Sequence, residues 1–586
     1  MNDTARRPNF QTIFFLFAVF LAFSLRLLEL GARPLSDEEA RWAIQAFDFT
    51  KGLHPAIGPQ PAYVLLTALI FYVFQASAFT ARLIPALAGA SLVFAPLLFR
   101  DRLGNKATLV LSFALALDPG LLALSRQAGS PIMILSTVVF ACGFWRIGNL
   151  RYAGIMTGLA LLSGPTLWPG VIGFALAWFI SRNLLSASTE EGSEEQRPLF
   201  DREQLITAGG YALGTYLAVG SLFLLATPGG LSAGLASLPT YLGGWVLADP
   251  SGVSPSYLFL ALIVYELLAV VLAAIGLVRG FRQQDPLTIS LGVWLAVALV
   301  IAVIYPSRQV ADLVWVLIPL WTLAALEFAH HLNPIQDGVW ETLGMVALTL
   351  AILIFALFNF LTIAISSTDM SAVARNVGAI QLTNGQVYGS VVIGSLFLLA
   401  ASVALVAYGW SKDVAIQGVT WGLLIGFTFY TLSASLAAAN LRTYQTQELW
   451  AVSPETHQEK ALLRQMNDSS RWDMGVNRGL DVFVGGVDSP ALRWALRDWN
   501  VTYSSAPTLS GSPSFVIGPG DNLSTPELAS GYRGQEFTWR RYPEWENNLP
   551  SDWLRWSISH KVAEKDEKII LWTRSDIFID ERSQEP

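Results

Sequence analysis

Long apolar runs dominate the first 440 residues, and they restrict the fold more than any other feature. Most approach the roughly 17–25 residues that an α-helix needs to cross a bilayer. Only 14% of the chain is charged, against roughly 25% in soluble domains. The sequence therefore predicts a polytopic α-helical membrane protein with about 13 transmembrane helices. The expected spans lie near residues 10–30, 80–99, 107–124, 131–148, 152–164, 168–182, 205–226, 257–279, 287–304, 312–330, 343–366, 388–410 and 416–438.

The charged residues are distributed unevenly. Of 81 in the chain, 37 lie in the last 146 residues. We therefore expect a transmembrane domain over 1–440, with its first outer loop at about 31–79, and a soluble α/β domain over 441–586. Strand-like runs at 481–484, 514–517, 536–539 and 568–572 and a helix at 490–499 support the second domain. Its tryptophans predict ordinary packing, with a carbohydrate-stacking face as the alternative; they include Trp494, Trp499, Trp539, Trp545, Trp553 and Trp556.

Basic residues predict the orientation in the membrane. The loops assigned to the cytoplasm carry 13 Lys or Arg, and the outer loops carry about half as many, which is the positive-inside pattern. This assignment treats the apolar segment 61–75 as an interfacial helix on the outer leaflet. It places the amino terminus in the cytoplasm and the carboxy-terminal domain outside, and we favour a prokaryotic cytoplasmic membrane. The acidic stretch Glu190–Glu195 then reads as a solvated cytoplasmic linker.

Three adjacent carboxylates open the first outer loop: Asp37, Glu38 and Glu39. Neighbouring like charges beside a low-dielectric slab raise one another's pKa values, which suits a general base. The same residues also fit the first turn of a helix, with Ser36 or Asp37 as N-cap. Both interpretations can hold together. Arg26, three residues before Glu29 in the first span, reads as half of a helical charge pair.

Several motifs, taken in order, resemble those of glycosyltransferase family 39. They are the acids followed by Ala40-Arg41-Trp42-Ala43, then Gly58-Pro59-Gln60-Pro61-Ala62-Tyr63, Ala81-Arg82-Leu83-Ile84-Pro85-Ala86-Leu87-Ala88-Gly89, Asp118-Pro119 and Ser125-Arg126-Gln127-Ala128, with a weaker match at Tyr305-Pro306-Ser307-Arg308-Gln309. The family includes protein O-mannosyltransferases and lipid A aminoarabinose transferases. The resemblance implies a GT-C fold and sugar transfer from a polyprenyl-phosphate donor to a protein, lipid or glycan acceptor on the extracytoplasmic face, usually with inversion.

The same resemblance implies roles for individual residues. An outer-loop acid, Asp37, Glu38 or Glu39, would act as general base, and Arg82, Arg126 and Arg308 would bind the lipid phosphate. Alignment on Arg41-Trp42-Ala43 favours Glu38 and Glu39, whereas residue identity favours Asp37 and Glu38, which we rank first. Many members carry an acid shortly after the position of Arg126, where this chain has Ser130-Pro131. Asp118 is a candidate replacement, although a cap before Pro119 is the simpler interpretation.

Other interpretations remain open. Arg82 and Arg308 near span ends also suit lipid headgroup contact. Glu266 lies inside a span and predicts a buried structural pair, but it would also suit a transporter or a flippase-associated factor in glycan export. A non-catalytic GT-C scaffold is a third alternative. The net charge of -7 argues against nucleic acid. No cofactor is named with certainty and no metal ligand set is predicted, while a divalent metal stays an open alternative.

Overall fold

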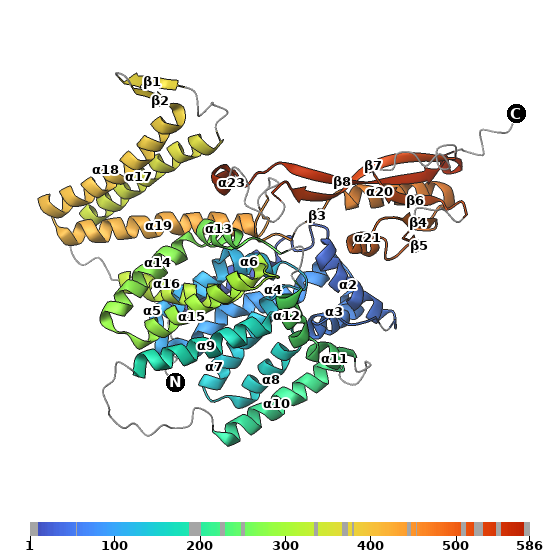
Figure 1. Ribbon diagram of the computed structural model, residues 1–586, viewed down its shortest axis with the longest axis horizontal. Coiled ribbons are helices and arrows are strands. Elements are labelled where there is room, and N and C mark those ends of the chain that lie inside the picture. The colour runs from blue at the N-terminus through green and yellow to red at the C-terminus, as the bar shows by residue number, and fades with distance from the viewer. Residues whose placement is uncertain are drawn as a thin grey trace, which may run out of the picture.

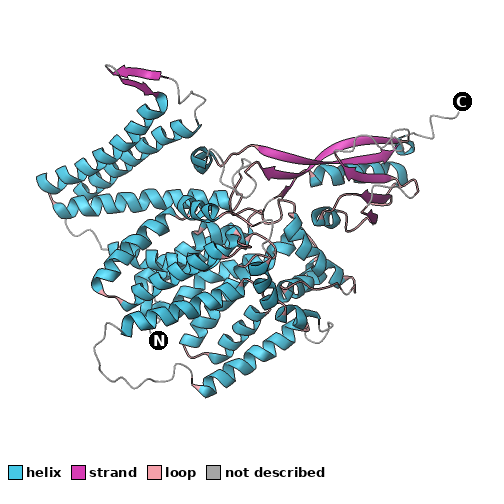
Figure 2. Ribbon diagram, viewed as in Figure 1, coloured by secondary structure: helices cyan, strands magenta, loops and turns pink. Residues whose placement is uncertain are grey.

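The computed structural model shows a helical bundle with a mixed sheet beside it (Figures 1 and 2). Nearly all strands gather in that sheet, and a separate two-stranded ribbon caps a projecting helix pair. The structure describes residues 10–53, 55–186, 201–222, 229–247, 252–332, 338–365, 373–377, 380–441, 447–452, 454–505, 511–520, 531–545 and 553–578. The acidic stretch Glu190–Glu195 lies outside these ranges.

The bundle is built from apolar helices joined by short turns. Serine, threonine and aspartate caps begin several of them, because their side-chain oxygens accept the unpaired amides of the first turn. In chain order the helices up to residue 246 are α1 (Phe10–Leu27), α2 (Asp37–Thr50), α3 (Pro61–Phe74), α4 (Ala78–Ser91), η1 (Leu92–Phe99), α5 (Arg100–Leu117), α6 (Pro119–Ser125), α7 (Ile132–Arg146), α8 (Leu150–Leu161), α9 (Leu167–Ser186), α10 (Arg202–Gly220), α11 (Gly229–Leu235) and α12 (Ser237–Val246).

The second part of the bundle contains its longest helices. Helices α17 and α18 project from the bundle with the β1–β2 ribbon at their tip, and α19 runs across the bundle (Figure 1). These elements are α13 (Pro255–Tyr265), α14 (Leu267–Gln283), α15 (Pro286–Ile304), η2 (Val310–Leu313), α16 (Val314–His331), α17 (Val339–Ile365), β1 (Val373–Val377), β2 (Ile380–Thr383), α18 (Asn384–Gly409) and α19 (Lys412–Ala438).

Each expected span coincides with a helix or a helix pair. Seven described helical segments are long and apolar enough to cross a membrane, and the pair α13–α14, bent by 91°, makes an eighth if it is one span. One of the seven, Ala78–Leu117, covers the span expected at 80–99 and the first part of the span expected at 107–124, and it breaks at Gly104, whose φ is +78°. The run expected at 107–124 is interrupted at Asp118, where α5 ends and α6 begins.

The six-stranded sheet has the order β3-β7-β8-β6-β4-β5. Strand β4 is parallel to β5 and β6, and the remaining pairs are antiparallel. All four strand-like runs are confirmed, and the helix expected at 490–499 is present but ends at Ala495, whereas β3, β5, α20 and α23 were not predicted. The elements are β3 (Glu455–Thr456), α20 (Glu459–Met474), β4 (Asp481–Gly485), α21 (Pro490–Ala495), β5 (Asn500–Ser504), β6 (Phe515–Pro519), β7 (Tyr532–Pro543), α23 (Trp553–Ser559), β8 (Glu564–Arg574) and η3 (Ser575–Phe578).

One hydrophobic cluster joins the sheet to the first outer loop. It contains Ala43 of α2 and Phe71 of α3 together with Phe515 and Trp539 of the sheet. The ring of Trp494 packs against Phe71 with 5.7 Å between centroids. Five of the six tryptophans singled out in the sequence are buried, which supports packing over a sugar-stacking face; Trp553 alone among them is exposed.

Candidate active site

The three acids of the first outer loop form the first turn of α2. Ser36 begins the helix in a capping box: its side chain accepts the amide of Glu39, and the Glu39 carboxylate accepts the amide of Ser36. The expected helix amino terminus is therefore present. Successive residues of a helix point about 100° apart, so the three carboxylates face three different surroundings.

Glu39 faces inward and pairs with Arg82 of α4. The guanidinium Nε and Nη2 each lie 2.7 Å from a carboxylate oxygen, and the Ala128 amide donates to the same carboxylate at 3.0 Å. Burial acts to raise the pKa of Glu39, but the charge and hydrogen bonds of Arg82 outweigh it and lower that pKa. Glu39 is therefore an ionised carboxylate that accepts four hydrogen bonds: two from Arg82, one from the Ala128 amide and one from the Ser36 amide.

Arg82 uses its five donor hydrogens within the protein. Besides the two bonds to Glu39, its terminal nitrogens donate to the carbonyl oxygens of Leu30, Arg33 and Pro34 at 2.9–3.1 Å. This matches the fixed donor fork of a guanidinium, which no other side chain reproduces. Arg82 thus holds the chain between α1 and α2 against α4.

Asp37 faces the sheet instead of the bundle. Its carboxylate accepts from Ser489 Oγ at 2.6 Å, from the Ala491 amide at 2.9 Å and from Arg540 Nε at 2.6 Å. Ser489 is the N-cap of α21, Ala491 lies in the first turn of that helix, and Arg540 belongs to β7. The third acid, Glu38, is exposed to solvent.

Small residues allow the motif segments to pack closely. A Cβ on Gly89 of α4 would overlap Ser125 Oγ, and a Cβ on Gly58 or Gly129 would overlap the Trp42 ring. Ser125 also accepts a hydrogen bond from Arg26 at 3.1 Å. The expected Arg26–Glu29 helical pair is therefore wrong: Arg26 is buried and also donates to main-chain oxygens of Ala22, Leu115 and Ala116.

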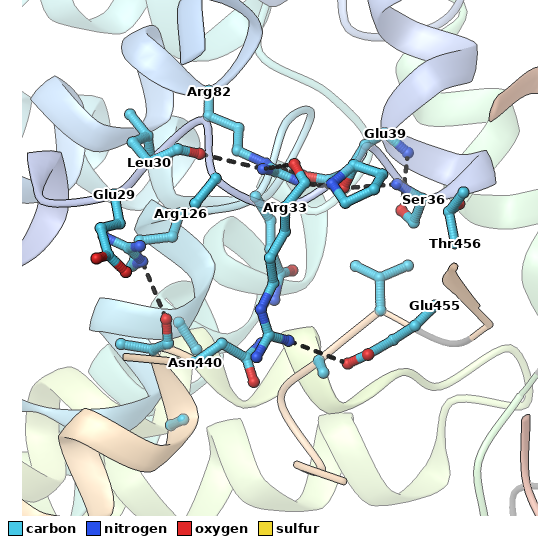
Figure 3. A pocket seen from close by; sticks show the side chains of 18 of the residues that line it. Glu29, Leu30, Arg33, Ser36, Glu39, Arg82, Arg126, Asn440, Glu455 and Thr456 are labelled. Carbon is cyan, nitrogen blue, oxygen red and sulfur yellow. Dashed lines mark hydrogen bonds and ion pairs between the residues drawn. The ribbon is translucent and has the colours of Figure 1, made fainter. Parts of the chain in front are cut away.

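A cavity of about 260 Å³ opens beside the Glu39–Arg82 pair (Figure 3). In Figure 3, Arg82 and Glu39 lie along its upper side, Arg126 lies beside Glu29, and Arg33 reaches toward Glu455. Four segments of the chain meet here: the stretch from α1 into α2, helix α4, the end of α6, and the chain from α19 to β3. The charged or titratable residues of the lining are Glu29, Arg33, Glu39, Arg82, Arg126, Glu455 and His457.

Arg126 joins α6 to neighbouring segments. Its Nε donates to Ala439 O at 3.1 Å, and its Nη1 donates to Leu25 O and Leu28 O at 2.8 and 2.7 Å. Burial lowers the pKa of Arg126 to about 10, and the charges of Arg82 and Arg33 act in the same direction. It stays cationic at neutral pH, and the nearby Glu29 carboxylate acts in the opposite direction to the two arginines.

Asp118 and Arg308 lie apart from this cavity. Asp118 is fully buried and caps α6 through the Leu121 amide, as the simpler interpretation expected, and it also accepts from the Trp321 indole. Trp321 donates to Glu266 as well, at 3.1 Å. Arg308 donates to Val303 O at 3.0 Å and is not among the described residues that line the cavity.

The cavity contains residues that the sequence did not single out. Arg33 precedes the acids, and its place at the head of the motif was a usable signal. Glu455 and His457 carried no such signal, because Glu455 lies in a two-residue strand some 420 positions later and His457 directly follows that strand. Among the described residues, no group of three or more His, Cys, Asp or Glu side chains is placed to hold a metal ion.

Comparison with known proteins finds a likeness in structure. The chain has the GT-C fold, and its apolar helices make it a multi-pass integral membrane protein. ArnT from Cupriavidus metallidurans, bound to undecaprenyl phosphate, matches with a TM-score of 0.56 and 14% identity over 96% of this chain and 98% of that chain. The apo state of the same protein matches at 0.50, with the same identity and coverage.

A third structure is more distant. The archaeal oligosaccharyltransferase AglB from Archaeoglobus fulgidus, in complex with an inhibitory peptide and a dolichol-phosphate, has a TM-score of 0.43 at 13% identity, over 89% of this chain and 70% of that chain. No protein-family model matches the sequence, and no curated protein matches it. The predicted fold class, a GT-C-like helical membrane protein with a carboxy-terminal sheet, is confirmed by the ArnT structures.

Proposed function

We propose that the chain is a membrane glycosyltransferase that moves a sugar from a polyprenyl-phosphate donor to an acceptor at the extracytoplasmic face, with inversion. One observation carries the proposal: in a GT-C fold, a cavity lined by one of the first-loop acids, Glu39, brings three arginines and three glutamates together. Guanidinium groups suit a phosphate, and carboxylates suit the proton of an acceptor hydroxyl. ArnT, which shares the fold, binds undecaprenyl phosphate.

The proposed chemistry is a single displacement. A carboxylate takes the proton of the acceptor hydroxyl while its oxygen attacks the anomeric carbon. The bond between that carbon and the phosphate oxygen breaks, and polyprenyl phosphate leaves with the electron pair. Cationic side chains stabilise the charge that develops on the phosphate. Attack from the face opposite the phosphate inverts the anomeric configuration.

The base is proposed to come from the first-loop acids. Glu38 belongs to both alignments of the motif, whereas Asp37 and Glu39 each hold a distant element in place. Substitution of Asp37 or Glu39 should therefore disturb structure and activity together. Loss of activity in a stably folded Glu38 variant would point to that residue as the base.

Membrane orientation follows the same proposal. We place the amino terminus in the cytoplasm and the cavity and the sheet outside, because the basic loops favour that arrangement. Cysteine-accessibility labelling in intact spheroplasts would test it, with a single cysteine introduced at Arg478, in the exposed turn before β4, and with Cys142 replaced. Labelling of Arg478→Cys only after permeabilisation would reverse the orientation.

Donor turnover in proteoliposomes tests the function. Purified protein is given a panel of radiolabelled polyprenyl-phosphate sugars with membrane extract as acceptor, and release of polyprenyl phosphate is measured. Wild type is compared with Asp37→Asn, Glu38→Gln and Glu39→Gln, and with Glu536→Gln, an exposed acid on the sheet, as control. If folded wild type releases nothing from any donor yet binds or translocates labelled lipid, a transporter, a flippase-associated factor or a scaffold replaces the transferase.

A further inference from the structure

The three arginines of the cavity differ in how many of their N–H groups already donate hydrogen bonds within the protein. Arg82 has all five donor hydrogens in bonds to Glu39 and to main-chain oxygens. Phosphate binding by Arg82 would require breaking a buried ion pair, which is costly. Arg82 therefore serves as a fixed wall of the cavity.

Arg126 has donors to offer. Its printed bonds engage Nε and Nη1, and among the residues that the structure describes its Nη2 has no hydrogen-bond partner. The two hydrogens on that nitrogen suit one oxygen of an anion. Burial, and then the charges of Arg82 and Arg33, lower the pKa of Arg126 to about 10, so the side chain is still cationic at neutral pH.

Of the three arginines, Arg33 has the weakest side-chain contacts. Its side chain is 38% exposed, and it reaches Glu455 of β3 across the cavity at a long 3.5 Å, without a hydrogen bond to any described residue (Figure 3). Its main-chain oxygen is held by Arg82, so the backbone is fixed while the guanidinium can change partner. A loose, partly exposed ion pair contributes little to stability, so exchanging its partner costs little.

We propose that Arg33, together with Nη2 of Arg126, binds the phosphate group of the lipid donor, and that Glu455 is a competing anion that holds Arg33 until the donor arrives. This rests on the proposed function. The phosphodiester of the donor carries one negative charge and two free oxygens, as a carboxylate does, and the polyprenyl monophosphate that leaves carries more of both. Either group can pair with a planar guanidinium in a bidentate manner and so compete with Glu455 for Arg33. Donor binding would then release Glu455 from its ion pair.

Loss of either partner of the Arg33–Glu455 ion pair should change the affinity for the phosphate, but in opposite directions. Removing the Arg33 charge takes a ligand away from the phosphate. Neutralising Glu455 takes a competitor away from Arg33. A pair that only stabilised the fold would give losses on both sides.

The experiment measures equilibrium binding of polyprenyl monophosphate to the full chain in nanodiscs. The variants are Arg33→Gln, Glu455→Gln and the double variant, with thermal unfolding confirming that each is folded. The matched control is the exposed pair Arg478–Asp498, which joins the turn before β4 to the turn after α21. It has a 2.9 Å contact and similar exposure, and it is substituted as Arg478→Gln and Asp498→Asn. Donor turnover is measured in parallel.

We expect Arg33→Gln to weaken binding by about tenfold or more, and Glu455→Gln to tighten it by about two- to fivefold. In the Arg33→Gln background, Glu455→Gln should have no further effect, whereas a general field effect of removing a negative charge would persist. The control pair should leave affinity unchanged.

Other outcomes overturn the inference. Unchanged affinity in Arg33→Gln places the phosphate elsewhere, and weaker binding in Glu455→Gln makes the pair structural. Wild type that transfers sugar while Arg33→Gln binds normally refutes this inference alone. Wild type that binds no polyprenyl phosphate refutes the proposed function with it.

Discussion

Arg82 shows how much structure one side chain in this protein organises. It joins α4 to the segment between α1 and α2 and to Glu39. We expect Arg82→Gln to lower the free energy of unfolding by about 3–5 kcal/mol, because it leaves the Glu39 carboxylate buried without its partner. Arg82→Lys should recover only part of this loss, since an ammonium offers three donors. Thermal unfolding in detergent measures both, and full stability of the lysine variant would contradict the assignment.

The Glu39 carboxylate should also leave a pH signature. Its folded pKa is lowered by Arg82 in spite of burial. The stability it contributes is therefore fully present above its ordinary pKa of 4.5 and is lost as pH falls below that value. The difference in unfolding temperature between wild type and Glu39→Gln should shrink between pH 6 and pH 4. A constant difference over that range would show that the ion pair contributes little.

For individual residues, the sequence predicted where charged side chains lie but not which residues they contact. It placed acids and arginines at one face, and two of the predicted arginines, Arg82 and Arg126, do meet in the cavity. It paired Arg26 with its helical neighbour Glu29, whereas the structure turns Arg26 inward to Ser125. The spacing of residues along one helix cannot predict contacts that form only when helices distant in sequence pack together.

At the scale of elements, α2 is the connection between bundle and sheet. Asp37 at its start bonds Ser489, Ala491 and Arg540. Asp37→Asn weakens charge-assisted bonds, each worth about 1.5–3 kcal/mol. We expect faster hydrogen exchange at α21 and the adjoining part of β7, with exchange in α16 unchanged. Asp473→Asn, an exposed acid at the end of α20, is the control. Equal protection in both variants would mean that the hydrophobic cluster alone holds α2.

Elements were predictable where a local pattern defines them. Long apolar runs marked the bundle helices, and alternating apolar runs marked β4, β6, β7 and β8. Strand β3 has only two residues and exists because β7 pairs with it. The break at Asp118 was hidden inside an apolar run, although the following proline suits a new helix start.

At the scale of the whole molecule, a second network couples the bundle to the carboxy-terminal part. At the 91° bend after α13, Tyr265 donates to Glu448 at 2.6 Å and accepts the Leu449 amide at 3.1 Å. His560 Nδ1 lies 3.0 Å from the same carboxylate. All three side chains are buried, so the network fixes residues 447–450 over the bend.

Removing one hydroxyl tests that coupling. We expect Tyr265→Phe to lower the free energy of unfolding by about 1–3 kcal/mol, because a buried carboxylate loses a donor. Tyr257→Phe is the matched control on the same helix, since the Tyr257 hydroxyl has no hydrogen-bond partner among the described residues. Differential scanning fluorimetry in detergent compares the two. Equal melting temperatures for both variants would remove the network as a structural link.

The span of 503 residues between Asp37 and Arg540 also has a meaning in time. Chains are synthesised at about 5–20 residues per second, so Asp37 is made roughly 25–100 s before its partner. During that interval the bundle can insert and Arg82 can already meet Glu39, only 43 residues away. The segment with Glu455, which forms one wall of the cavity, is synthesised much later. A ribosome-bound intermediate would thus hold a membrane-embedded bundle with its outer site unfinished, and completion of the site would coincide with near-completion of synthesis.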